Sequence, residues 1–142
     1  MSQNPPFSLP IRVYWEDTDA GGVVYHAAYV CFLERARTEW LRSLGVSQQV
    51  LRENEDVVFA VRGMQVDFLA PARLDDALEV GVRIAEVGRA SVVFAQRIVR
   101  IADGRVLIEA TVRVACLSAA VFKPRSLPET LRRRFQDSTP TD

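Results

Sequence analysis

One short segment, residues 14–29, gathers most of the side chains in this chain that could do chemistry. It reads YWEDTDAGGVVYHAAY and holds three carboxylates, two consecutive glycines and the only histidine, His26. A pattern typical of an α-helix begins directly after it. The first N–H groups of a helix have no partner inside the helix, and the helix dipole favours negative charge there. Such a loop can polarise a carbonyl group while a nearby carboxylate, from Glu16, Asp17 or Asp19, attacks it or activates water.

Other kinds of site fit this segment poorly. Asp17, Asp19 and Gly22 match three positions of a calcium-binding EF-hand loop, but Ala28 stands where that loop needs a glutamate. His26 and Cys31 do not have the spacing of zinc ligands. Glycine-rich phosphate loops and the G-x-S-x-G motif of serine hydrolases are absent from the sequence. We therefore expect no metal here.

The histidine can contribute in two ways. A single His26 side chain at a helix start is more often a capping or packed residue than a catalyst. Its backbone N–H is an oxyanion donor whatever the side chain does. A separate candidate is Arg89 beside Ser91, at a predicted turn where a strand end could meet a phosphate group.

The composition indicates a soluble globular protein with one domain, residues 1–142, and loose ends at 1–7 and 136–142. Eighteen basic and eighteen acidic residues cancel, so nucleic acid is not an expected partner. No apolar run reaches the roughly 18–20 residues of a membrane span, and the first residues do not form a secretory signal. Cys31 and Cys116 do not form a disulfide framework, which favours reduced thiols in the cytoplasm.

Periodicity predicts the elements that position the loop. Apolar residues at every second position predict a strand over 9–15, and spacings of three and four predict a helix over 26–44. Gly45 is a plausible C-cap, and Ser47 the N-cap of a short helix over 47–53. The remaining expected elements are strands over 57–69, 78–87, 91–101 and 106–117, some strand at 121–123, and a helix over 127–135 that has Pro128 in its first turn.

This order of elements predicts an α+β fold. A single long helix cannot cover both faces of an antiparallel sheet, so it should lie across one face. The long strands leave edges that pairing across a two-fold axis would protect, so we expect a homodimer or homotetramer.

The loop pattern Asp-x-Asp-x-x-Gly-x-x-Tyr-His-x-x-Tyr over 17–29, followed by ERAR at 34–37, resembles the hotdog-fold acyl-CoA thioesterases of the 4-hydroxybenzoyl-CoA thioesterase superfamily. It looks closest to their Tol–Pal-associated, YbgC-type branch. Segments 67–76, 94–98 and 123–125 agree, so the similarity runs from about Arg12 to Phe135.

The resemblance implies a hotdog fold, in which an antiparallel sheet wraps a long helix, and hydrolysis of acyl-CoA without metal or organic cofactor. It implies that Asp19 is the catalytic aspartate and that the N–H of His26 polarises the thioester carbonyl. Asp19 could form a mixed anhydride or activate water. The backbone near Gly22 would assist, and Tyr25 would shape the pocket. Ala28 departs from the branch, which often has a polar residue there.

We expect a thioesterase that acts on short-chain or aromatic acyl-CoA. Arg89 and Ser91 should contact the CoA nucleotide, and the CoA they contact could be one bound to the neighbouring subunit. An alternative is a non-catalytic acyl-CoA binder or Tol–Pal-associated interaction protein. A third hypothesis is a hydratase in which His26 is the base and Glu34 the acid.

Overall fold

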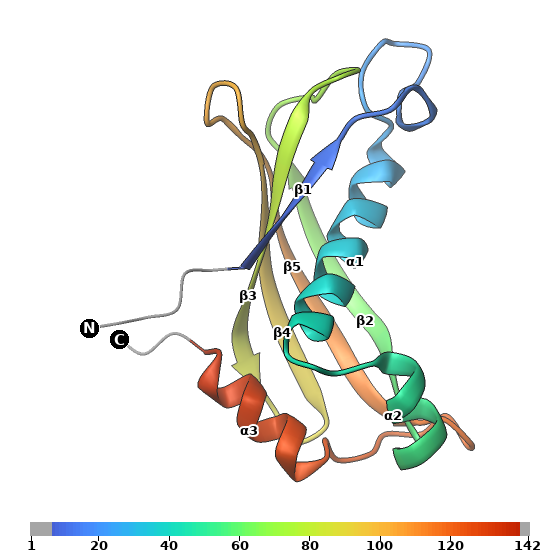
Figure 1. Cartoon of the computed structure of the whole chain (residues 1–142). Helices are drawn as coiled ribbons and strands as arrows, with labels where there is room; N and C mark the ends of the chain where they lie inside the picture. The colour runs from blue at the N-terminus through green and yellow to red at the C-terminus, as the bar shows by residue number, and fades with distance from the viewer. Residues whose placement is uncertain (1–6, 140–142) are drawn as a thin grey trace.

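The computed structural model describes residues 7–139, which form a five-stranded antiparallel sheet with a long helix along one face (Figure 1). The strands are β1 (Phe7–Arg12), β2 (Val57–Phe68), β3 (Ala77–Val87), β4 (Ser91–Arg100) and β5 (Val106–Ser118). Their order in the sheet is β1-β3-β4-β5-β2, so β1 and β2 are its edges. The predicted α+β architecture is confirmed.

The long helix α1 (His26–Ser43) buries one face against the sheet. Its buried residues recur at spacings of three and four, as a helix with one apolar face requires. They are Tyr29, Phe32, Leu33, Ala36, Trp40 and Leu41. Two shorter helices follow, α2 (Gln48–Glu55) and α3 (Glu129–Asp137). None of the helices in residues 7–139 has the length and apolar character that a membrane crossing needs.

Most predicted boundaries hold to within one or two residues. The side chain of Ser47 caps α2 by accepting the N–H of Val50 at 3.3 Å. Gly45 follows α1 with a φ of +79°, a conformation that glycine adopts without steric cost. Gly104, in the turn between β4 and β5, has a φ of +69°.

The first strand was predicted too far along the chain. Trp15 is 83% exposed and lies in a short 3-10 turn, Trp15–Asp17, after β1 has ended. The cause is local, because the Asp17 carboxylate accepts the backbone N–H of Tyr14 at 2.9 Å and closes a turn. The alternating apolar pattern therefore outlasts the strand.

The prediction of a strand at 121–123 was wrong, because none of these residues is part of a strand. The chain turns after β5, and Phe122 adopts a φ of +58°. Asp56 fixes this turn by accepting the Ser118 hydroxyl at 2.6 Å and the Ala120 N–H at 2.8 Å.

The ends of the chain also differ from prediction. Pro128 is the N-cap of α3, not part of its first turn. Phe7 lies in β1 and residues 136–137 lie in α3, although all three were predicted to belong to loose ends. Residues 1–6 and 140–142 lie outside the described residues.

Candidate active site

Asp19 lies in a tight loop that leaves its side chain exposed. The backbone N–H of Gly21 donates to Asp19 Oδ1 at 2.8 Å, and the N–H of Gly22 donates to the Asp19 carbonyl at 3.0 Å. The N–H of Asp19 in turn donates to the carbonyl of Val23 at 2.9 Å. Gly22 has a φ of +81°, which the loop needs to reverse direction. These bonds present one carboxylate at the surface in a defined orientation.

The same loop is tied to the start of α1. Thr18 and Val24 form an isolated antiparallel bridge, and the N–H of Tyr25 donates to the carbonyl of Asp17 at 2.8 Å. The helix then begins at His26. Within residues 7–139, the backbone N–H groups of His26 and Ala27 have no hydrogen-bond acceptor. An exposed carboxylate and free helix N–H groups thus belong to one small, hydrogen-bonded unit.

The buried side chain of Tyr29 is connected to this unit by hydrogen bonds through Ala72. The N–H of Ala72 donates to the hydroxyl oxygen of Tyr29 at 2.9 Å, and the carbonyl of Ala72 accepts the N–H of Val24 at 2.9 Å. Burial is the main reason that the pKa of Tyr29 is raised, and the charges of Asp76 and Asp19 raise it further. The hydroxyl therefore stays protonated, and the Asp19 carboxylate lies close enough to influence it.

Aromatic side chains line the surface beside the helix start. The exposed His26 ring lies 4.5 Å from the ring of Tyr25 and 6.5 Å, edge-on, from that of Phe68 at the end of β2 (centroid distances). Phe68 is 53% exposed. The structure thus brings the predicted residues Asp19, Gly22, Tyr25 and His26 together in one region.

Arg89 and Ser91 lie elsewhere. The Asp19 loop is bonded to residues 72–73, shortly before β3, whereas Arg89 follows the far end of this eleven-residue strand (Figure 1). Such a strand is about 35 Å long. Arg89 Nε donates to the Ser126 hydroxyl at 2.9 Å. One chain does not bring this pair to Asp19, so their predicted role at the same substrate requires another copy.

Sequence reasoning included Tyr29 in the loop pattern without giving it a role, and it gave the backbone of Ala72 no role either. Tyr29 lies one helical turn after His26, so its spacing gave a signal. Ala72 gave none, because its backbone makes the contacts. Across residues 7–139, no cluster of three or more His, Cys, Asp or Glu side chains is placed to hold a metal ion.

Residues 21–107 match the family model described as Thioesterase superfamily. The chain is 53% identical over 130 residues to the acyl-CoA thioester hydrolase YbgC of Escherichia coli, a match that covers 92% of this chain and 96% of the relative. It is 46% identical over 129 residues to the acyl-CoA thioesterase YbgC of Haemophilus influenzae, with 91% and 93% covered.

Solved structures agree. A 1,4-dihydroxy-2-naphthoyl-CoA thioesterase from Synechocystis superposes with a TM-score of 0.86 at 26% identity, with 94% of this chain and 97% of that chain covered. A probable thioesterase from Bartonella henselae gives a TM-score of 0.81 at 37% identity, with 87% and 100% covered. This chain therefore belongs to the thioesterase superfamily, with its hotdog fold, and within it to the YbgC branch of acyl-CoA thioesterases.

Proposed function

We propose that this enzyme hydrolyses acyl-CoA with Asp19 as the catalytic carboxylate and the N–H groups at the start of α1 as the oxyanion site. The observation that carries the proposal is the hydrogen-bonded unit described above. Its exposed carboxylate and its free N–H groups of His26 and Ala27 belong to the same loop-helix junction. The similarity to curated acyl-CoA thioester hydrolases favours this activity over a non-catalytic acyl-CoA binder.

The chemistry follows from the two groups. The thioester carbonyl oxygen accepts the helix N–H groups, which stabilise the negative charge that develops on it. Gly21 N–H holds Asp19 Oδ1, while no donor in residues 7–139 binds Oδ2. Oδ2 then either takes a proton from a water that attacks the carbonyl carbon, or attacks the carbon itself. In both routes the C–S bond breaks, CoA leaves as the thiol, and the acyl group ends as a free carboxylate after water has been consumed.

The substrate class is a further part of the proposal. Short-chain and aromatic acyl groups fit the aromatic surface that Tyr25, His26 and Phe68 form beside the helix start. A panel of acyl-CoA esters, from acetyl to benzoyl and dodecanoyl, tests this choice. A preference for the longest chain would contradict it.

Assembly and location also belong to the proposal. The outer edge of β2 has no neighbouring strand within residues 7–139, and Val61 and Phe68 on this strand are about half exposed. Pairing of β2 with a second copy would protect that edge. The free thiols Cys31 and Cys116 support a cytoplasmic location, and the likeness to the YbgC branch supports a Tol–Pal association. Sedimentation of the purified protein as a single chain would contradict the assembly.

The decisive experiment replaces Asp19 by asparagine. Asp19→Asn should lower kcat by at least a hundredfold, since acid-base groups typically contribute 10²- to 10⁴-fold. The matched control is Glu16→Gln, which removes one charge from the same segment at an exposed residue. Equal activity of Asp19→Asn and Glu16→Gln, with both proteins folded, would overturn the assignment.

A further inference from the structure

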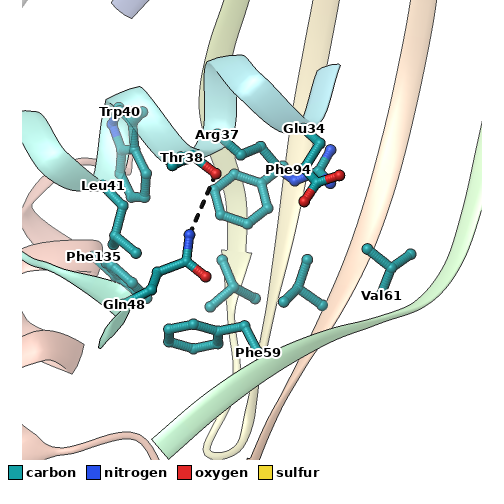
Figure 2. Close-up of a pocket in the computed structure, with 12 residues that line it drawn as sticks. Glu34, Arg37, Thr38, Trp40, Leu41, Gln48, Phe59, Val61, Phe94 and Phe135 are labelled. Carbon is teal, nitrogen blue, oxygen red and sulfur yellow. Dashed lines mark hydrogen bonds between the residues drawn. The ribbon is translucent and has the colours of Figure 1, made fainter. Parts of the chain in front are cut away.

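A cavity of about 90 Å³ lies between α1 and the sheet (Figure 2), and the helix residues that line it, all within 34–41, lie beyond the first two turns of α1. Thr38, which lines the cavity, is twelve residues after His26, or about 18 Å along the helix. Aromatic side chains form much of its wall, and they contact one another. They are Trp40, Phe59, Phe94 and Phe135. Val61, Val92 and Val114 complete the apolar part.

The polar part of the wall contains a half-buried cation. Arg37 Nη1 donates to the side-chain oxygen of Gln96 at 2.9 Å, and Gln96 Nε2 donates to the carbonyl of Leu33 at 3.0 Å. Gln96 is only 4% exposed, so this chain of bonds fixes the guanidinium. In Figure 2, Arg37 and Glu34 project from α1 at the side of the cavity.

Among residues 7–139, the charge of Arg37 has no directly paired anion. Within residues 7–139, no carboxylate oxygen lies within 4 Å of its nitrogens, and burial lowers its pKa. Glu34 also lines the cavity and acts on the Arg37 charge through space, without forming a salt bridge with it. A desolvated guanidinium without a paired anion is costly, and its planar fork matches a carboxylate.

We propose that this cavity binds small monocarboxylates, with the carboxylate on Arg37 and a short apolar chain against the aromatic wall. On this measure a water needs roughly 10–15 Å³, so a cavity of about 90 Å³ has room for about six non-hydrogen atoms, the size of butyrate. Acids of this class are also what acyl-CoA hydrolysis releases. The inference rests on the proposed function only for this source of the ligand.

The first experiment titrates sodium butyrate into the full chain and follows valine methyl signals by NMR. The signals of Val61, Val92 and Val114 should shift, while that of Val24, beside the Asp19 loop, should not. Butyramide is the neutral control of the same size and should bind at least tenfold more weakly, because it cannot form charge-assisted bonds. Equal binding of the amide, or shifts centred on Val24, would overturn the proposal.

Substitutions supply the second test. Arg37→Gln should weaken butyrate binding at least tenfold, whereas Arg35→Gln, an exposed arginine two residues away, should leave it unchanged. Glu34→Gln should strengthen binding, because it removes a neighbouring negative charge. Unchanged binding in Arg37→Gln would refute the site.

The two proposals fail separately. Asp19→Asn should abolish hydrolysis and leave butyrate binding intact. Loss of butyrate binding in Asp19→Asn would place the acid at the catalytic loop and overturn this inference, without touching the proposed hydrolysis.

Discussion

The backbone N–H of Ala72 donates a 2.9 Å hydrogen bond to the hydroxyl oxygen of Tyr29, one turn inside α1. The carbonyl of the same residue accepts the N–H of Val24, at the end of the Asp19 loop. Ala72 is therefore bonded to the helix on one side and to the loop on the other. This double attachment fixes how the carboxylate lies relative to the helix start.

Removing the Tyr29 hydroxyl should loosen that geometry. Tyr29→Phe leaves the buried N–H of Ala72 without a partner, which should cost about 1–3 kcal/mol of unfolding free energy. We expect kcat to fall on the order of ten- to a hundredfold with a small change in KM, because a displaced catalytic group costs rate more than binding. Steady-state kinetics and urea unfolding measure both. Tyr14→Phe makes the same chemical change at a tyrosine that is 63% exposed, and should leave both unchanged.

The conformation of Gly22 gives a second prediction. An alanine at a φ of +81° should cost about 1–2 kcal/mol, although its Cβ would meet no atom within 4 Å. Gly104→Ala is the matched control, since Gly104 also has a positive φ and open space around it. Both variants should lose similar stability in urea, but only Gly22→Ala should lose activity. Equal kcat values in the two would show that the loop conformation does not matter for catalysis.

The third prediction concerns α3. Phe135 is 1% exposed and its ring lies 5.4 Å from that of Trp40. Phe135→Ala should lower the unfolding free energy by about 3–5 kcal/mol through the cavity it creates. Phe122→Ala removes the same side chain at a 66% exposed position and should change it far less. Similar denaturation midpoints for the two variants would mean that α3 does not stabilise the fold.

The fourth prediction concerns pH. Bonds from the Ser118 hydroxyl and from the Ala120 N–H lower the pKa of Asp56 below its usual value. A carboxyl whose pKa is lower in the folded state stabilises the protein above its ordinary pKa of about 3.9, and this contribution is lost as the pH falls below that value. Ser118→Ala should therefore raise the pKa of Asp56, as read from its carboxyl NMR titration, and move acid unfolding to higher pH. An unchanged titration would refute this.

The parts of the site that sequence predicts are those within one short segment. Asp19, Gly22, Tyr25 and His26 lie within eight residues, so their closeness follows from chain connectivity. The bond from Ala72 to Tyr29 spans 43 residues, and that from Arg37 to Gln96 spans 59. Such pairs depend on the register of strands and helix, which periodicity does not define.

Trp15 shows the opposite limit. Its apolar side chain continues the alternating pattern of β1. The carboxylate of Asp17, however, accepts the backbone N–H of Tyr14, and the chain forms a 3-10 turn there instead of a strand. Hydrogen bonds from a side chain to the nearby backbone compete with strand pairing, and a hydrophobic pattern does not reveal them. Asp56 forms such a bond in the turn after β5.

The support that Ala72 gives is a property of the main chain. An alanine scan would not test position 72, since alanine is already there. Only proline, which has no N–H to offer the tyrosine, would expose its importance directly.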